Sequence, residues 1–393
     1  MTSNVRTVAI AGAGIGGLAA ALALARQGIA SNVFERRAGI SEDGAGIQIG
    51  PNGCRVLSEL GVLDRVRVQA AEPDAISVHD GTSGRVLTWL PLGTWIRERH
   101  GASYLTLHRQ DLHAGLREAA IAEPLITLRP GVEVTGFSNH PSGVEVTLSV
   151  DAPVTSDALV ASDGLWSKLR AKVTDAPPVK PFGKCAYRAI LPSAALPQGL
   201  TPNDVHIWLS PGAHAVHYPV RGGREIALVV IVDANAVENA WNIEAKPAWK
   251  AALTTAQFAP ALLDLLSGAE HWCMWPLQTL PPLPRWTNGN VALLGDAAHP
   301  VLPFFAQGGA MALEDAAVLA ANIANTTLSM PQRLRAYEQS RRARVARVAE
   351  ASLSNGRIYH MHGAAAAARN AVLTSVPPHL LMRRYDWLYG WTP

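Results

Sequence analysis

Short apolar runs that end abruptly in glycine or aspartate recur along this chain of 393 residues. So short an apolar run, bounded by turn residues, is typical of a strand buried in a parallel sheet. Gly12, Asp163 and Asp296 lie at or next to the points where these runs stop. We therefore expect three strand ends that meet one extended ligand. The three runs cover residues 6–11, 158–161 and 291–294.

The first run leads into a glycine-rich turn and then into an Ala- and Leu-rich helical pattern. Gly12, Gly14 and Gly17 form a GxGxxG fingerprint, and Glu35 ends the next expected strand. Gly12 permits the tight turn, Gly14 lets the backbone approach a pyrophosphate, and Gly17 lets the helix pack on the strand. Glu35 would accept the ribose hydroxyls, with Arg36 beside it as a further candidate for binding the dinucleotide. A glycine-rich turn without any ligand is the alternative.

The last run opens residues 291–315, the stretch on which our interpretation is centred. Pro300 and Pro303 exclude a regular helix in the turn that follows. Gly308-Gly309 then begins an apolar helix that we expect to end near Asn325. The free N–H groups and the dipole of its first turn would hold an anionic or electron-rich ligand edge. Taken alone, this stretch also fits an ordinary crossover, but the N-terminal fingerprint favours a ligand.

The composition changes near Pro177-Pro178, where strand patterns rich in Trp and Pro begin. Strands are expected within 185–191, 205–209, 214–219 and 225–233, with one helix from about 247 to 266 between later strands. The sequence thus predicts an α/β fold in which an antiparallel sheet is inserted into a Rossmann-like nucleotide-binding domain. The expected division gives the nucleotide-binding domain 1–72, 98–176 and 285–355, the inserted domain 73–97 and 177–284, and a helical tail 356–393.

Composition and charge narrow the classes of function. With 48% hydrophobic and 17% charged residues, a net charge of +3 and no basic block, the chain is expected to be soluble and not to bind nucleic acid. The sequence has no signal-peptide layout and no continuous membrane span. Cys54, Cys185 and Cys273 lack metal-ligand spacing and favour a reducing compartment. We expect a cytoplasmic monomer or homodimer, without a metal, that acts on a small molecule.

Three motifs in this order resemble those of the single-component (group A) FAD-dependent aromatic hydroxylases, over essentially the whole chain. The motifs are GxGxxG with Glu35, Ser162-Asp163-Gly164, and Gly295-Asp296-Ala-Ala-His-Pro. The chain looks most like members that act on 6-hydroxynicotinate, and less like those that act on salicylate or 3-hydroxybenzoate. The resemblance implies a p-hydroxybenzoate hydroxylase-like fold, an FAD cofactor, and NADH or NADPH and O₂ as co-substrates. It also implies hydroxylation of a hydroxylated aromatic or pyridine carboxylate through a flavin C4a-hydroperoxide, with or without decarboxylation.

The same resemblance suggests roles for several side chains near the expected flavin. Asp163 and Asp296 would contact FAD, although Asp163 could instead cap the helix that follows it. Arg109, at a helix start, could reach a phosphate or a flavin oxygen. The alternative for Arg109 is a surface arginine near Asp111. His299 is better explained as a histidine that stabilises its turn.

The catalytic candidates are His214, Tyr218, Gln48 and Pro303. His214 and Tyr218 are four residues apart and share one face of a strand, where they could bind the substrate's hydroxyl or carboxylate or form an ordinary core pair. Gln48 could hydrogen-bond flavin or substrate, and Pro303 would belong to an apolar wall that excludes water. Gln48 and Phe304 stand where members acting on 6-hydroxynicotinate carry histidines. An NAD-dependent dehydrogenase and a non-catalytic flavin-binding redox sensor are the rival functions.

Overall fold

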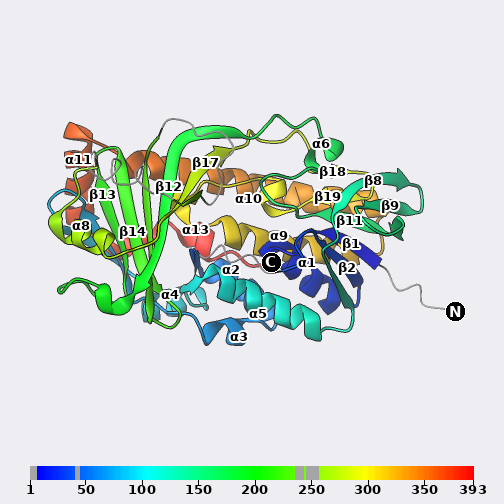
Figure 1. The fold of residues 1–393 in the computed structure, drawn as a ribbon, viewed down its shortest axis with the longest axis horizontal. Coiled ribbons are helices and arrows are strands. Elements are labelled where there is room, and N and C mark those ends of the chain that lie inside the picture. The colour runs from blue at the N-terminus through cyan, green and yellow to red at the C-terminus, as the bar shows by residue number, and fades with distance from the viewer. Residues whose placement is uncertain (1–6, 40–44, 235–242, 245–255) are drawn as a thin grey trace.

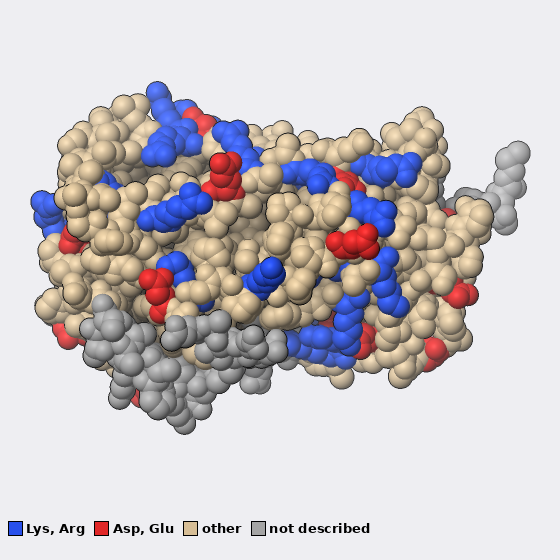
Figure 2. Space-filling model, turned by 90° about the horizontal axis from the view of Figure 1, so that it is seen from above, with Lys and Arg blue, Asp and Glu red and all other residues tan. Residues whose placement is uncertain are grey.

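The computed structural model of the chain describes residues 7–39, 45–234, 243–244 and 256–393. Two large sheets, one of six strands and one of eight, form its frame, and helices pack beside both (Figure 1). On the face shown in Figure 2, basic and acidic side chains interleave across the surface. Within the described ranges, no helix has the length and apolar character needed to cross a membrane.

The six-stranded sheet places the three apolar runs side by side in the order β18-β19-β11-β1-β2-β7. All neighbouring strands are parallel except β18, which is antiparallel to β19. The carboxyl ends of β1, β11 and β19 therefore meet at one edge of the sheet, as the sequence predicts. The strands are β1 (Thr7–Ala11), β2 (Ala30–Glu35), β7 (Ile126–Pro130), β11 (Ala158–Ala161), β18 (Thr287–Asn288) and β19 (Val291–Leu293).

The helices beside this sheet pack closely because small residues line their contacts. A Cβ added at Gly16 of α1 would lie 2.7 Å from Leu294 and 3.3 Å from Ala312 of α9, so glycine is needed for this approach. The long α10 begins at a capping box formed by Ser329 and Gln332. These helices are α1 (Ile15–Arg26), α2 (Pro51–Glu59), α3 (Leu63–Arg67), α5 (Arg109–Ala122), α9 (Gly308–Ala324) and α10 (Met330–Tyr359).

The eight-stranded sheet has the order β16-β17-β12-β15-β14-β13-β4-β5. Its pairs are antiparallel except β13 with β4, which are parallel. No hairpin sets the direction of β4 against β13, because β4 comes from a distant upstream segment. The strands are β4 (Ala75–Asp80), β5 (Val86–Pro91), β12 (Lys180–Pro192), β13 (Val205–Ser210), β14 (Ala213–Val220), β15 (Glu225–Asp233), β16 (Ile243–Glu244) and β17 (Cys273–Thr279).

Two helices differ from the expectation. α8 (Pro260–Ser267) starts at Pro260, since proline fits the first turn of a helix but not its interior. The earlier part of the expected helix, 247–255, lies outside the described residues, and 256–259 are not helical. Residues 93–97, which the sequence assigns to the inserted sheet domain, are helical and belong to α4 (Gly93–His100), which begins where Gly93 adopts a φ of +47°.

The remaining elements connect the two large sheets or extend from them. A two-stranded sheet pairs β3 with β6, and a three-stranded sheet has the order β10-β9-β8. Their bounds are β3 (Gly46–Ile49), β6 (Leu105–His108), β8 (Val134–His140), β9 (Gly143–Leu148) and β10 (Val154–Ser156). The other helices and 3-10 turns are α6 (Arg170–Val173), α11 (Gly363–Ser375), α12 (Pro378–Arg383), α13 (Asp386–Tyr389), η1 (Ser193–Ala195), η2 (Gly295–Ala297) and η3 (Pro303–Phe305).

The two faces of the eight-stranded sheet have different neighbours. On the outer face, Trp208 packs in the same apolar cluster as Leu262 and Leu265 of α8. On the inner face, Tyr218 belongs to the main core, and Ile231 packs with Phe304 of η3. The inner face is therefore the one directed toward the loops that follow β19 and precede α9.

Three buried histidines stack on the outer face beside Trp208. The rings of His206 and His217 are 4.4 Å apart, and His79 stacks 4.1 Å from Trp208. Nε2 of His79 and Nδ1 of His206 share a hydrogen bond of 2.9 Å. Burial lowers the pKa of His79 to about 4, with His206 adding to the effect, and it lowers the pKa of His217 well below its ordinary value. All three rings are therefore neutral in the folded protein near pH 7.

These histidines should make the fold acid-sensitive. Between pH 6.5 and about 4 the unfolded chain binds a proton at His79 that the folded chain does not, so the free energy of unfolding falls as pH falls through this window. For one such histidine the loss at pH 5 is about 2 kcal/mol. We expect His79→Asn to lose less stability than the parent protein between pH 7 and pH 5, measured by urea unfolding. His140→Gln, a change at an exposed histidine, should keep the full pH dependence; identical losses in all three proteins would contradict this prediction.

Candidate functional site

The loops after β1, β11 and β19 line one cavity of about 380 Å³, together with the end of β2 and the start of α5. Gly12 and Gly14, Asp163, and Asp296 reach it from the three strand ends that the sequence predicts to meet. Cationic side chains are frequent in its lining, which suits phosphate groups. They are Arg36, Arg37, Arg109, Arg117, Arg129 and Lys168.

The glycine turn after β1 is fixed by contacts that leave one side open. Gly12 has a φ of +99°, and a Cβ there would lie 2.6 Å from the carbonyl oxygen of Ser162. A Cβ at Gly17 would lie 1.9 Å from the carbonyl oxygen of Gly12, so Gly17 serves helix packing and does not line the cavity. Apart from its chain neighbours, no described residue comes within 4 Å of a Cβ added at Gly14. The turn is closed toward the protein and open toward the cavity, which fits a pyrophosphate.

The acidic end of β2 holds this turn in place. One carboxylate oxygen of Glu35 accepts a hydrogen bond of 2.9 Å from the N–H of Ala13, and the other accepts one of 2.9 Å from the N–H of Arg37. Both Glu35 and Arg36 line the cavity. Each oxygen keeps a further lone pair for a ligand hydroxyl, so Glu35 can serve the turn and a ribose together.

Asp163 holds the turn after β11 but is not the N-cap of α6, whose N-cap residue is Leu169 without a side-chain cap. Oδ2 of Asp163 accepts hydrogen bonds of 3.0 Å and 3.3 Å from the N–H groups of Lys168 and Leu169. Its Oδ1 is buried and has no partner, although Asp163 lines the cavity. A buried carboxylate oxygen without a donor is costly, and a ligand hydroxyl or amide at this point would supply one.

Arg170 joins two of the three strand ends and was not recognised from the sequence. Its side chain is buried and donates to the carbonyl oxygens of Ala297 at 2.7 Å, Asp296 at 3.0 Å and Leu165 at 2.8 Å. A single guanidinium thereby ties the loop after β11 to the loop after β19. An arginine in a short helical pattern carries no sequence signal for such contacts, because its carbonyl partners are distant in the chain.

Asp296 and Arg109 border the same cavity. The side chain of Asp296 is open to the cavity but surrounded by protein, which raises the pKa of its carboxyl, while His299, Arg109 and Arg170 lower it. Oδ2 of Asp111 lies 3.9 Å from Nε of Arg221, and within the described part of the chain Arg109 forms no ion pair with Asp111. Arg109 at the start of α5 is thus available to a ligand anion.

A second group of predicted residues lies on the inner face of the eight-stranded sheet and does not line this cavity. His214 and Tyr218 of β14 both point to that face, as expected for two residues that are four positions apart in one strand. Gln48 of β3 accepts a hydrogen bond of 2.5 Å from the hydroxyl of Tyr104. A Cβ at Gly46 would lie 2.5 Å from the hydroxyl of Tyr218, so glycine lets β3 approach β14. Burial raises the pKa of Tyr218 to about 12.

His214 is enclosed by aromatic rings. Its ring lies 5.7 Å from that of Phe304 and 5.1 Å from that of Tyr359, and its Nδ1 shares a hydrogen bond of 2.7 Å with Nε2 of His360. Burial, followed by the nearby His360 and Lys184, lowers its pKa well below the ordinary value. His214 is therefore a neutral imidazole, able to accept a proton through Nε2.

The loop between β19 and α9 carries the remaining candidates. Pro303 starts η3, and Phe304 packs so closely on α10 that a Cβ at Gly356 would lie 2.9 Å from its ring. Gly309 faces Ile47, where a Cβ would come within 2.8 Å, whereas Gly308 has no protein atom within 4 Å of its added Cβ. The first turn of α9 is thus open at Gly308 and packed at Gly309.

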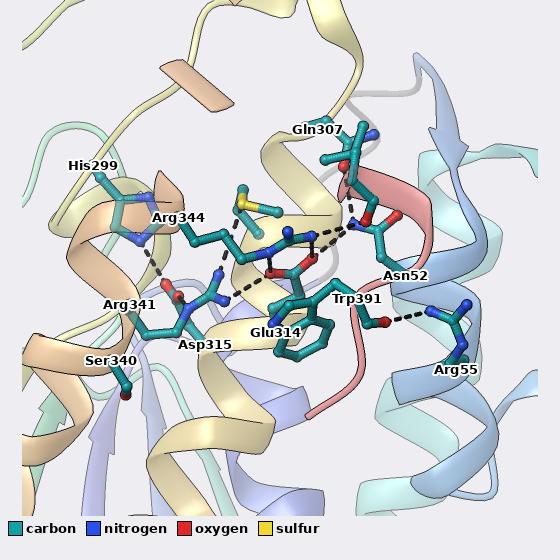
Figure 3. A network of polar contacts seen from close by, with 12 residues as sticks. Asn52, Arg55, His299, Gln307, Glu314, Asp315, Ser340, Arg341, Arg344 and Trp391 are labelled. Carbon is teal, nitrogen blue, oxygen red and sulfur yellow. Dashed lines mark hydrogen bonds and ion pairs between the residues drawn. The ribbon is translucent and has the colours of Figure 1, made fainter. Parts of the chain in front are cut away.

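A buried ion cluster fixes this loop to the helices (Figure 3). Asp315 accepts from the N–H of Gly295 at 3.1 Å, from Nε of Arg341 at 2.7 Å, and pairs with His299 at 2.6 Å. Burial raises the pKa of Asp315, but His299 and Arg341 outweigh it and bring it to about 2. Glu314 accepts from Arg341 at 2.7 Å and from Arg344 at 2.6 and 2.7 Å. His299 is thus a structural residue, as expected.

The aromatic residues of the C-terminal tail pack on the same cluster. The guanidinium of Arg344 lies 5.2 Å from the ring of Trp391, and that of Arg347 lies 3.9 Å from the ring of Trp387. Tyr389 lies 6.1 Å from Tyr104, ring to ring. The tail therefore packs within the molecule, where Tyr389 contacts Tyr104, the hydrogen-bond donor to Gln48.

Comparisons with known proteins agree with this geometry. A family model described as an FAD binding domain matches residues 6–352. A 3-hydroxybenzoate 6-hydroxylase of Aquipseudomonas alcaligenes is 36% identical, covering 98% of this chain and 97% of that protein. A 6-hydroxynicotinate 3-monooxygenase of Bordetella bronchiseptica is 34% identical, with 88% and 91% covered. The crystal structure of Klebsiella pneumoniae HpxO complexed with FAD and uric acid has a TM-score of 0.85 at 25% identity, covering 99% of this chain and 97% of that one.

Gly14→Ala tests whether the open side of the turn belongs to FAD. The added methyl meets no protein atom within 4 Å, so the apoprotein should unfold at the same temperature as the parent. It would occupy the space of the pyrophosphate, and we expect FAD affinity to fall by about tenfold or more. Flavin fluorescence titration measures the affinity and calorimetry the unfolding temperature. Unchanged FAD affinity would place the cofactor elsewhere.

Arg341→Met tests the ion cluster. It removes one of the cationic partners of each of two fully buried carboxylates, and breaking a buried pair costs about 3–5 kcal/mol. We expect a loss of this size in urea unfolding, together with poorer FAD retention because Asp315 also anchors Gly295. Arg335→Met, an exposed position on the same helix, is the matched control and should leave both quantities near the parent values. Equal behaviour of the two variants would show that the cluster is not important for stability.

Proposed function

We propose that this chain, which belongs to the FAD binding domain family and is an FAD-dependent monooxygenase of aromatic rings, acts on a ring that carries both a hydroxyl and a carboxylate. The relatives named for 3-hydroxybenzoate and 6-hydroxynicotinate act on rings of this kind. NADH or NADPH and O₂ are the co-substrates of such enzymes. We propose the inner face of the eight-stranded sheet as the place where the ring binds.

The observation that carries this proposal is the cation on that face, Arg188 of β12. It aligns across the sheet with Val229 and Val216, in the row between those of His214 and Tyr218. Its guanidinium carbon lies 4.0 Å from the ring centre of Trp275, and its Nε is buried without a hydrogen-bond partner.

Arg188 has no carboxylate partner among the residues that the structure describes. Burial lowers its pKa to about 10, so it is still charged near pH 7. A charged guanidinium with a buried, unsatisfied Nε is costly, and its planar donors match a carboxylate in a bidentate pair. A substrate carboxylate would supply the missing anion.

Neutral side chains near Arg188 suit the substrate's hydroxyl. His214 can accept the hydroxyl proton, which makes the ring more nucleophilic. Tyr218, with a pKa of about 12, keeps its own proton and can donate a hydrogen bond. Gln48 can orient Tyr218 and the ring but cannot act as a base. When bound, FAD supplies the activated oxygen, and Pro303 with Phe304 keeps water away from it.

The cavity at the three strand ends is our proposed site for the rest of FAD. Gly12, Gly14 and the start of α1 would bind the pyrophosphate, and Glu35 with Arg36 the adenosine side. Asp163, Arg109 and Asp296 line the same cavity and would hold the ribityl part. Gly308 and Gly309 would present N–H groups of α9 to the electron-rich edge of the ring system.

The test is a panel containing 3-hydroxybenzoate, 6-hydroxynicotinate and a phenol without a carboxylate. NAD(P)H consumption and product mass are followed together. We expect a hydroxylated product from a carboxylated ring, and Arg188→Gln should raise its KM by about tenfold or more, since a charged hydrogen-bonding partner is lost. The KM for the uncharged phenol should not change. Arg224→Gln, an exposed position, is the control.

Three outcomes would contradict the proposal or its assignment of Arg188. Oxidation of an alcohol by NAD⁺ without flavin would point to a dehydrogenase. A flavoprotein that consumes no NAD(P)H with any ring in the panel would favour a redox sensor. A KM that rises equally for charged and uncharged rings would remove Arg188 as the carboxylate partner while leaving the monooxygenase intact.

A further inference from the structure

A continuous chain of hydrogen bonds leads from the inner face of the eight-stranded sheet to the protein surface. Nδ1 of His214 bonds to Nε2 of His360 at 2.7 Å, and Nδ1 of His360 bonds to the amine of Lys184 at 2.7 Å. Lys184 in turn pairs with Asp233. These four residues come from β14, the end of α10, β12 and β15.

Solvent exposure increases from His214 to Asp233 along this series of hydrogen bonds. His214 is 2% exposed and His360 9% exposed. The side chain of Lys184 is 18% exposed and that of Asp233 is 70% exposed. Asp233 also lines a separate cavity of about 240 Å³ with Pro211 and Gly212. One end therefore lies in the protein interior and the other in contact with water.

The backbone is shaped to make these contacts. The pairing of β12 with β17 shifts register between Pro181 and Cys185, and Gly183 within this irregularity has a φ of +78°. Such a bulge re-aims the neighbouring side chain, here Lys184, which lies directly opposite Asp233. The carbonyl of His360 accepts from the N–H of Gly212 at 3.3 Å, which docks the end of α10 at the start of β14.

The surroundings keep both imidazoles neutral. Burial, with Lys184 adding to it, lowers the pKa of His360 to about 4, against an opposing effect of Asp233. The other groups packed around His214 are the rings of Phe304 and Tyr359, which carry no charge near pH 7. A neutral imidazole has one donor and one acceptor nitrogen, so two in series can pass a proton by exchanging tautomers.

We propose that His214, His360 and Lys184 form a proton relay that carries the hydroxyl proton of the substrate ring to water beside Asp233. This inference rests on the proposed function, because it requires a ring hydroxyl at Nε2 of His214. His214 touches the substrate; His360 and Lys184 act through it as positioning and relay residues.

The proton balance is simple. Lys184 first releases one proton to water beside Asp233. The neutral amine then accepts a hydrogen bond from the Nδ1–H of His360, so that both imidazoles take the tautomer with hydrogen on Nδ1 and Nε2 of His214 is open to a proton. The ring O–H bond then breaks as its proton moves to Nε2 of His214, the Nδ1 proton of His214 moves to Nε2 of His360, and the Nδ1 proton of His360 moves to Lys184. The ring becomes a phenolate, water gains one proton, both imidazoles end neutral, and no electron is transferred.

The relay is tested without turnover, on the FAD-loaded protein in the absence of NAD(P)H. Binding of 3-hydroxybenzoate or 6-hydroxynicotinate is followed by the flavin difference spectrum, and proton release by a pH indicator in weakly buffered solution. We expect the parent protein to release a proton as the ring binds. Lys184→Met and His360→Ala should still bind the ring but release the proton about 10²-fold more slowly.

Added imidazole should restore fast release in His360→Ala, which a purely structural role would not predict. Lys180→Met, an exposed lysine on the same strand, should release the proton as fast as the parent. Binding with unchanged proton release in both variants would overturn the relay, as would binding to the parent without any release. If neither ring perturbs the flavin spectrum of the parent protein, the proposed function itself fails.

Discussion

The buried ion cluster between α9 and α10 is the constraint on which the site depends. Glu314 and Asp315 are fully buried, and Arg341 meets both of them. A buried charge without its partner costs several kcal/mol, so the two helices have essentially one way to pack. Because Asp315 also binds the N–H of Gly295, the same contact fixes the turn that carries Asp296. The position of a carboxylate that lines the cavity is thus set by charged residues that do not line it.

α10 connects the two halves of the proposed chemistry. Its middle carries Arg341, beside the strand ends of the six-stranded sheet, and its end delivers His360 to the inner face of the eight-stranded sheet (Figure 1). Close contacts on both sides, such as Phe304 against Gly356, keep the loop between β19 and α9 in one position. A rigid connection of this kind suits an enzyme that must hold a ring, a flavin and a proton acceptor in fixed relation.

Burial is used differently in the two parts of the site. At the strand ends, backbone N–H groups, arginines and open glycines produce a cavity suited to an anionic ligand. On the inner sheet face, burial lowers the pKa of both His214 and Arg188, but only His214 is thereby neutral near pH 7, and Arg188 keeps its charge. This contrast places a neutral acceptor and a cation on one face of the sheet, as the proposed substrate, a ring with a hydroxyl and a carboxylate, requires.

The sequence by itself determined the parallel sheet, the glycine turn and the strand ends, because short apolar runs, φ-permissive glycines and capping residues act locally. The strand ends meet in one cavity because the strands pair in parallel. His214 and Tyr218 share one face because side chains in a strand alternate between its two faces. Tertiary structure alone decided the partners of Arg170, Arg188 and His360. Their contacts join segments far apart in the chain. A single arginine or histidine gives no signal in the sequence that distinguishes a solvated side chain from a buried one.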